Sequence, residues 1–241
     1  MTFHNYLSIN EAAKLLNVSI DTLRRWDKNG KLKAIRRKEG GYRYYPKETV
    51  ELYLKDIFAI AKKWASNLPV LPEPEYYCPD SLVFKMRLGR LEKDLSKIDK
   101  IKNVFPLITA IVSEIGNNSY DHNLGNWPDI RGIFFAYDLN KKQIVLADRG
   151  QGLLKTLRKV RPELKNDEEA LEVAFTEVIS SRMPEARGNG LKFVRQVISD
   201  NLFSLEFYTG SAKLSMMPRS ANLDIITSDV VYPGCVSLIK F

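Results

Sequence analysis

The sequence predicts an α+β protein made of two unequal parts. Residues 1–67 hold 14 Lys or Arg against 7 Asp or Glu, a net charge of +7, whereas residues 68–241 hold 23 against 22, a net charge of +1. The first part reads as two short capped helices followed by a hairpin at a glycine pair. The second part mixes helical and strand patterns after a proline-rich break. Such a charge asymmetry indicates a polyanion-binding module joined to a nearly neutral domain.

The amino-acid composition and the spacing of apolar and cysteine residues favour a soluble cytoplasmic chain. The 241 residues are 44% hydrophobic and 27% charged, as in ordinary globular proteins. No apolar run approaches the roughly 18 residues of a membrane span, and the N-terminus has no secretory leader pattern. Cys78 and Cys235 stand far apart, which favours reduced thiols and no structural zinc. We therefore expect no membrane partner.

The first part begins with a helix-turn-helix pattern. Ser8 or Asn10 is the N-cap candidate of a short apolar-periodic helix, and Asn17 suits its left-handed C-cap. Ser19 caps a second helix, which Gly30 ends. Two short helices with a tight turn between them are typical of this motif.

A basic hairpin and a further helix follow. Gly40 and Gly41 predict the turn of a two-stranded wing that includes Tyr42–Pro46. An apolar-rich run then predicts one helix over residues 48–66.

The run EAAKLLNVSIDTLRRWDKNGKL followed by GGYRYY resembles the winged-helix DNA-binding domain of the MerR and excisionase superfamily, over about residues 6–54. In that family the second helix enters the major groove and the wing grips the flanking backbone, so the resemblance implies double-stranded DNA as a partner. Guanidinium groups suit phosphates and guanine edges. Trp26 is expected in the core. The candidate DNA contacts are Thr22, Arg24, Arg25, Arg36, Arg37, Arg43 and Tyr44.

Prolines set the expected boundary. Three of them within residues 69–74 predict a semi-rigid extended linker. The expected organisation is residues 1–67 as the basic domain with its trailing helix, 68–81 as linker and 82–241 as the second domain. Phe84, Leu88, Leu91, Leu95 and Ile98 then form an apolar stripe, which either packs onto the second domain or forms a dimer seam.

A polar arc lies on the next predicted helix. Glu114, Asn118, Asp121 and His122 fall at i, i+4, i+7 and i+8, and therefore on one side. A carboxylate can take a proton from water, and a carboxamide oxygen suits a hard cation. The alternative is a helix end with solvated polar groups.

Two glycine motifs follow the strands predicted at 131–138 and 143–148. The second strand runs into DRGQG, so Asp148 stands at a sheet edge where the glycines let a flat ring approach. Gly188 and Gly190 precede another helix, whose N-terminal N–H groups suit phosphate. Further strands are expected at 204–217, 222–232 and 235–241.

In this order, the motifs resemble the boxes of the GHKL (Bergerat) ATP-binding fold of histidine-kinase catalytic domains, gyrase B, heat-shock protein 90 and anti-sigma kinases. The resemblance covers about residues 82–241 and implies a two-layer α/β sandwich that binds ATP and Mg²⁺. It implies Glu114 as general base, Asn118 as magnesium ligand and Asp148 as the adenine-reading acid. The other implied ATP-site residues are Gly150, Gly152, Gly188 and Gly190. Arg187 is a candidate phosphate contact, and the alternative is an exposed lid charge.

The chain departs from this family in places. GNGL is shorter than the phosphate loop of histidine kinases, and Cys235 stands where Thr or Ser is common. The segment before GNGL looks more like that of anti-sigma kinases. A histidine autokinase is not expected, because the helix at 82–103 has no acceptor histidine.

The favoured hypothesis is a DNA-binding transcriptional regulator, expected to be a homodimer, whose ATP–Mg²⁺ state alters binding to DNA or to a protein partner. An anti-sigma-type serine/threonine kinase or an ATPase tethered to DNA is the alternative. A degenerate fold that serves as an interaction module is the third possibility.

Overall fold

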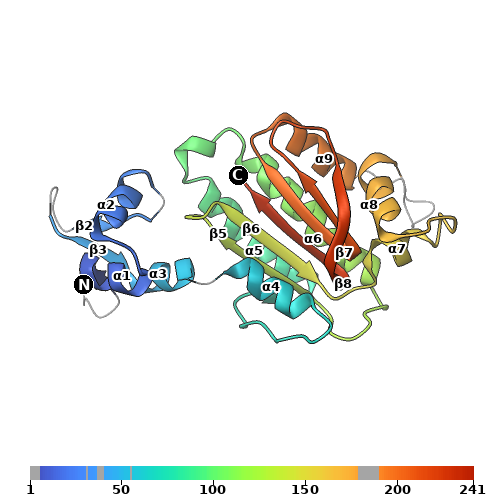
Figure 1. Ribbon diagram of the computed structural model, residues 1–241, viewed down its shortest axis with the longest axis horizontal. Helices are drawn as coiled ribbons and strands as arrows, with labels where there is room; N and C mark the ends of the chain where they lie inside the picture. The colour runs from blue at the N-terminus through green and yellow to red at the C-terminus, as the bar shows by residue number, and fades with distance from the viewer. Residues whose placement is uncertain (1–5, 31, 37–40, 55, 179–189) are drawn as a thin grey trace. The chain divides into compact units, whose positions relative to one another are not determined.

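The computed structural model describes residues 6–30, 32–36, 41–54, 56–178 and 190–241. The chain divides into two compact units (Figure 1). The first comprises Met1–Ile57 with Asp138–Lys142, and the second comprises Phe58–Tyr137 with Gln143–Phe241. Within the described ranges, none of the helices combines the length and apolar composition that a membrane crossing requires.

The first unit is a small winged helix-turn-helix. Strand β3 pairs antiparallel with both β1 and β2, and the register sets Arg36 opposite Arg43 in the wing. Its elements are β1 (Tyr6–Ser8), α1 (Ile9–Leu16), α2 (Ile20–Lys28), β2 (Ile35–Arg36), β3 (Arg43–Pro46) and α3 (Lys47–Leu54).

Local capping explains why α1 and α2 form where they do. Ser8 and Glu11 make a reciprocal capping box, in which each side chain bonds the backbone of the other. Asn17 ends α1 with a left-handed φ of 52°, and the Ser19 hydroxyl accepts the N–H of Thr22 at the start of α2. These sequence predictions are confirmed. Trp26 packs half-buried against the small core of this unit.

The second unit is a mixed helix and sheet structure. Its elements are α4 (Ile57–Ala65), β4 (Tyr77–Cys78), α5 (Ser81–Leu95), the 3₁₀ turn η2 (Asp99–Ile101), α6 (Phe105–Asn123), β5 (Ile133–Asp138), β6 (Gln143–Asp148), α7 (Gly152–Leu157), α8 (Asp167–Thr176), α9 (Gly190–Asp200), β7 (Ser204–Met216) and β8 (Asp224–Lys240).

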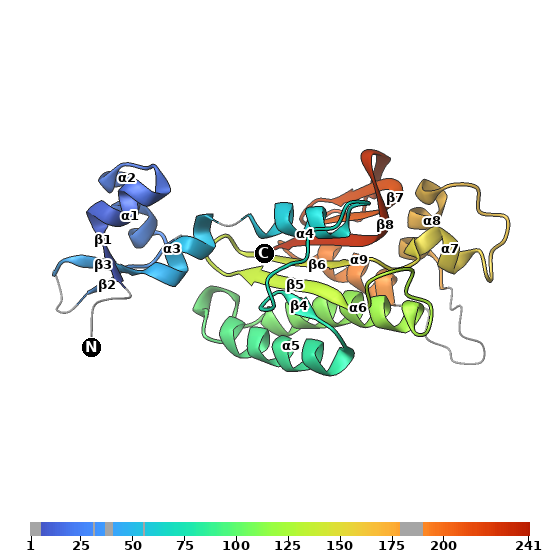
Figure 2. The ribbon, with the colours of Figure 1, turned by 90° about the horizontal axis from the view of Figure 1, so that it is seen from below.

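A five-stranded sheet in the order β4-β5-β6-β8-β7 organises this unit. Strand β8 pairs antiparallel with β6 and β7, and β4 pairs antiparallel with β5. Helices α5 and α6 lie on one face of the sheet and α4 lies on the other (Figure 2). All residues of β6 are buried, as expected for a strand covered on both faces. The predicted α+β class is therefore confirmed.

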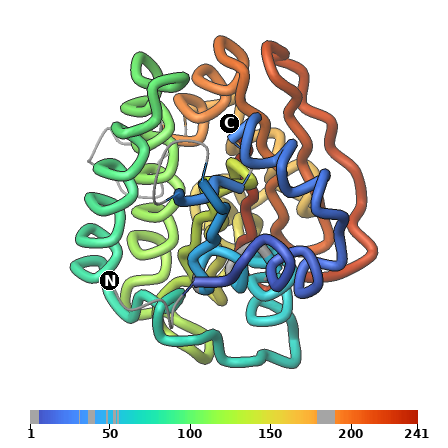
Figure 3. The backbone as a smooth tube through the Cα atoms, turned by 90° about the vertical axis from the view of Figure 1, so that its left-hand side faces the viewer, coloured from blue at the N-terminus to red at the C-terminus, as the bar shows by residue number. Residues whose placement is uncertain are grey.

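Helices α5 and α6 run side by side (Figure 3). Phe84, Leu88, Leu91 and Leu95 form the buried face of α5, so this stripe packs inside the second unit. The Phe84 ring makes an edge contact with Phe135 of β5. Of the two uses considered for the stripe, packing within the domain is the one the structure bears out.

Two element predictions were wrong. The single helix expected over 48–66 is two helices, because Val50 of α3 packs in the core of the first unit while α4 packs in the second. The unit change therefore precedes the proline-rich stretch at 68–81. The strands expected at 222–232 and 235–241 are one strand, β8, with register shifts opposite Thr209 and Gly210.

Two helix-interior glycines provide a stability prediction. A Cβ at Gly116 of α6 would overlap the Phe84 ring, whereas a Cβ at Gly89 of α5 would meet nothing within 4 Å. Gly116→Ala should lower the free energy of unfolding by about 1–3 kcal/mol through overpacking. The matched control Gly89→Ala should raise it by up to about 1 kcal/mol, because alanine is the better helix former.

Denaturant unfolding followed by circular dichroism measures both changes. Adding Phe84→Leu to Gly116→Ala should recover part of the loss, because the smaller side chain vacates the overlap. Equal stability of the two alanine variants would contradict the packing described for α5 and α6.

Candidate functional sites

A basic groove lies in the first unit between α2 and the wing. Its lining residues are Arg24, Arg25, Asp27, Lys28, Lys33, Ala34, Arg36 and Arg43. Arg24 and Arg25 are exposed on α2, and Arg24 pairs with exposed Asp21 at 2.9 Å. An exposed pair of this kind contributes little to stability, so the Arg24 guanidinium can exchange Asp21 for a phosphate.

Asp27 joins the wing to α2. Its Oδ2 accepts from the Arg43 Nε–H at 2.7 Å and from Arg36, and its Oδ1 accepts from the Ala34 N–H at 3.1 Å. Burial opposes the ionised form of Asp27, but the hydrogen bonds from Arg43 and Ala34 and the charge of Arg36 hold its pKa below the ordinary value. The carboxylate therefore stays charged and fixes two wing arginines beside α2.

The groove brings together four of the predicted DNA contacts, namely Arg24, Arg25, Arg36 and Arg43. Thr22 and Tyr44 do not line it. The Thr22 hydroxyl is hydrogen-bonded to Ser19 at 2.9 Å as part of the helix cap. Arg37 lies outside the described residues. Lys28, Lys33 and Asp27 were not predicted, although Lys28 lies one turn after Arg24 on α2.

In the second unit, Asp148 ends strand β6 and is buried. Its Oδ2 accepts from the Ser119 hydroxyl at 2.8 Å, and its Oδ1 accepts the N–H groups of Gly150 at 2.8 Å and Cys235 at 3.4 Å. Burial raises the pKa of the Asp148 carboxyl to about 6, although all three hydrogen bonds act to lower it. The carboxyl is therefore still ionised at neutral pH.

The turn after Asp148 depends on its glycines. Gly152 has a φ of +72°, which a side chain rarely adopts, and the next N–H, of Leu153, donates to the Thr209 hydroxyl at 3.1 Å. Gly150 lies so close to the Asn123 amide that a Cβ there would overlap it. Asn123 in turn accepts the Gln151 N–H at 2.8 Å. Helix α6 therefore holds this turn against the end of the sheet.

The start of α9 lies beside the polar arc of α6. A Cβ at Gly190 would lie 2.6 Å from Oε2 of Glu114 and 3.4 Å from Nδ2 of Asn118. The Glu114 carboxylate and the Asn118 amide therefore lie close to the start of α9. The other predicted residues of this loop, Arg187 and Gly188, lie outside the described residues.

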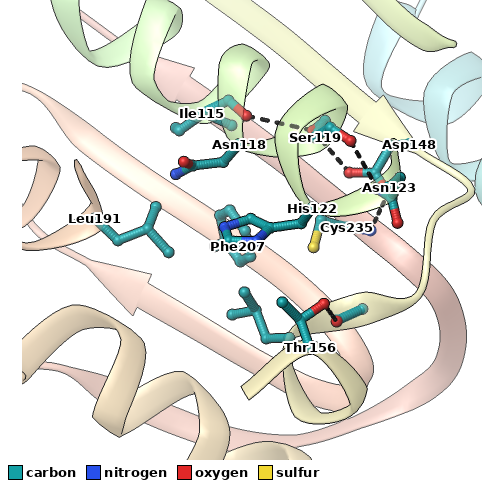
Figure 4. Close-up of a pocket in the computed structure, with 12 residues that line it drawn as sticks. Ile115, Asn118, Ser119, His122, Asn123, Asp148, Thr156, Leu191, Phe207 and Cys235 are labelled. Carbon is teal, nitrogen blue, oxygen red and sulfur yellow. Dashed lines mark hydrogen bonds between the residues drawn. The ribbon is translucent and has the colours of Figure 1, made fainter. Parts of the chain in front are cut away.

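A pocket opens between these elements (Figure 4). Its empty volume is about 450 Å³, including space open to solvent. It is lined by Ile115, Asn118, Ser119, His122, Asn123, Asp148, Gly152, Leu153, Thr156, Leu191, Phe207 and Cys235. Burial and the nearby charge of Asp148 raise the pKa of the Cys235 thiol, which therefore stays neutral.

Three of the predicted ATP-site residues, Asn118, Asp148 and Gly152, line this pocket, and Gly150 lies in its turn. Glu114 is not a lining residue. Sequence reasoning missed Ser119 and Asn123, which share a stripe with Ile115 at i, i+4 and i+8 and are buried. The sequence pattern that could have identified Ser119 and Asn123 is the occurrence of polar residues on an otherwise apolar stripe of the helix. Among the described residues, no group of three or more His, Cys, Asp or Glu side chains is placed to hold a metal ion.

Comparisons with known proteins concern a small part of the chain. Residues 8–45 match the MerR family of regulatory proteins, so this segment is a MerR-family helix-turn-helix domain, and it implies DNA binding. The type II methyltransferase M.Eco47II of Escherichia coli is 42% identical over 63 residues. That match covers 26% of this chain and 15% of the methyltransferase. The chain thus spans a small fraction of that relative.

Proposed function

We propose that this chain is a DNA-binding regulator whose second unit is a GHKL-type domain that binds ATP with Mg²⁺. The observation that carries the proposal is Asp148, a buried carboxylate that lines a pocket beside a glycine turn. The MerR-family segment supports the DNA-binding half. We do not propose a methyl-transfer activity for this chain, because the similarity covers 15% of the methyltransferase.

The pocket chemistry suits an adenine ring. Oδ2 of Asp148 accepts one hydrogen bond, from Ser119, and a carboxylate oxygen has room for a second. An exocyclic amine can therefore donate to it. Ile115, Leu153 and Phe207 supply apolar surface for a flat ring.

The residues at the α9 end suit phosphate and magnesium. Helix α9 begins at Gly190, and N–H groups at a helix start favour anions. Mg²⁺ often takes only one or two protein ligands, and substrate phosphates and water complete its shell, so Asn118 can serve as the protein ligand. When bound, the ion would neutralise phosphate charge. Asn118 would orient the ion, and the Glu114 carboxylate beside the start of α9 would accept a proton.

DNA binding with and without nucleotide tests the coupling. DNA selected from a random pool by the full chain would be labelled and titrated with protein, alone and with saturating ATP–Mg²⁺. We expect the affinity to change about fivefold or more, or the number of chains bound per site to change. The stoichiometry also tests the predicted homodimer. Identical affinity and stoichiometry in both states would refute coupling.

Glu114→Ala separates nucleotide binding from turnover. We expect the variant to bind ATP as the wild type does, since Glu114 does not line the pocket around Asp148. Any ATP hydrolysis, or transfer to a partner's hydroxyl, should fall about 10²–10⁴-fold if Glu114 is the general base. Phosphate release and labelling by radioactive ATP measure the two reactions separately. Turnover equal to that of the wild type would contradict this role, and Asp121→Ala on the same helix is the matched control.

A further inference from the structure

Arg149, next to the proposed adenine acid, is buried, with 5% of its side chain exposed. Its Nε–H donates to Asp129 Oδ2 at 2.9 Å, and its NH2 group forms a second bond to the same carboxylate. Burial opposes the ionised form of Asp129, yet the Arg149 hydrogen bond is the largest of the effects that hold its pKa below the ordinary value. A bidentate pair of this kind fixes the guanidinium plane.

The remaining nitrogen of Arg149 reaches the end of α4. Its NH1 group donates to the Trp64 carbonyl at 2.9 Å and also to the Ser66 carbonyl. Carbonyls in the last turn of a helix have no partner within the helix, and a cation there is favourable. Arg149 thus caps α4 from the turn that follows Asp148.

Aromatic contacts dock α4 on the sheet. The buried Trp64 ring makes an edge contact with Tyr77 and lies against Phe134, and Phe58 contacts Tyr208 of β7. Helix α4 begins at Ile57, where the segment Met1–Ile57 of the first unit, which includes the MerR-family match, gives way to the second unit. A shift at its end would therefore reach the segment that connects the two units.

We propose that Arg149 is a positioning residue that links the Asp148–Gly150 turn of the nucleotide pocket to the end of α4. This inference rests on the proposed ATP site and deepens it by naming the route of coupling. The backbone of Arg149 belongs to the turn after Asp148, and its guanidinium, held by Asp129, bonds the carbonyls that end α4. Movement of the turn when nucleotide binds is therefore transmitted to the helix.

Hydrogen exchange of the full chain, with and without ATP–Mg²⁺, tests the link. In the wild type, ATP–Mg²⁺ should slow amide exchange in peptides that cover residues 149–153 and also in those that cover 58–66. In Arg149→Gln at saturating ATP–Mg²⁺, slowing should persist at 149–153 and disappear at 58–66. In Arg149→Gln, ATP–Mg²⁺ should change the DNA affinity by no more than about twofold. The DNA affinity without nucleotide should equal that of the wild type.

Arg158→Gln is the matched control. Arg158 also donates to two backbone carbonyls, those of Leu164 and Lys165, at 2.9 and 3.0 Å, but these belong to the segment between α7 and α8. It should keep the wild-type exchange pattern. If Arg149→Gln does not fold, Asp129→Asn loosens the same guanidinium while leaving its charge, and should reduce the slowing at 58–66.

The outcomes separate this inference from the proposed function. Slowing at 58–66 that survives in a folded Arg149 or Asp129 variant would overturn the role of Arg149 and leave ATP binding intact. Slowing at 149–153 without slowing at 58–66 in the wild type would also overturn it. Exchange that ATP–Mg²⁺ changes nowhere in the wild type would instead count against the ATP site itself.

Discussion

Asp148→Asn should weaken ATP binding by about tenfold or more and leave the fold intact. The asparagine oxygen can accept the Gly150 and Cys235 N–H groups, and its nitrogen can donate to the Ser119 hydroxyl, so the local network is kept. That nitrogen then faces the amine of adenine, and two donors cannot pair. Hydrogen bonds to charged groups contribute about 1.5–3 kcal/mol, so we expect an affinity loss of about ten- to 150-fold.

The pKa of Asp148 adds a pH dependence with a defined sign. Burial raises this pKa from 3.8 to about 6. The buried charge therefore lowers the free energy of unfolding by its full amount above about pH 6, and this cost disappears as the pH falls from about 6 to 3.8. Nucleotide binding needs the ionised form and should change in the opposite direction. ATP affinity should weaken as the pH falls through about 6.

Calorimetric titration of ATP into the wild type and Asp148→Asn at pH values around 6 measures the affinity loss and its pH dependence. The variant should be as stable as the wild type at pH 7, or more stable, because it has no charge to bury. A folded variant that binds ATP with wild-type affinity would show that Asp148 does not read the adenine. Absence of ATP binding in the wild type and the variant alike would favour the degenerate interaction module.

Local chemistry explains which elements the sequence predicted well. The caps at Ser8, Asn17 and Ser19 and the end of β6 at Asp148 depend on neighbours within a few residues. The division between α3 and α4 does not depend on such near neighbours. Both helices have apolar positions, and what separates them is that they pack in different units, which no local pattern reports.

The same distinction holds at the pocket. Asn118, Asp148 and Gly152 belong to recognisable short patterns, whereas Ser119 matters because its hydroxyl reaches Asp148, 29 positions later in the chain. Cys235 approaches Asp148 from still farther away, through pairing of β8 with β6. Contacts of this length are set by sheet register, which local patterns do not report. The sequence reasoning also wrongly ended a strand before Pro233 and Gly234, through which β8 runs.

Replacing Arg24 and Arg43 together by alanine should weaken DNA binding and flatten its salt dependence. Each lost phosphate contact reduces the slope of log affinity against log salt by about 0.9, so the double variant should lose about 1.8. Anisotropy titrations over a range of salt concentrations measure this slope. Lys47→Ala removes one charge from the same unit outside the groove and should change the slope less.

Asp27→Asn tells positioning apart from net charge. The substitution makes the basic groove more positive, so electrostatic attraction alone predicts tighter DNA binding. The structure predicts weaker binding, because Arg36 and Arg43 lose the carboxylate that holds the wing beside α2. Tighter binding would mean that these arginines act as loosely placed charges, and Asp21→Asn, which removes an exposed carboxylate that pairs with Arg24 alone, is the control. If Asp27→Asn binds DNA more weakly while Asp21→Asn binds it equally or more tightly, Asp27 orients the wing.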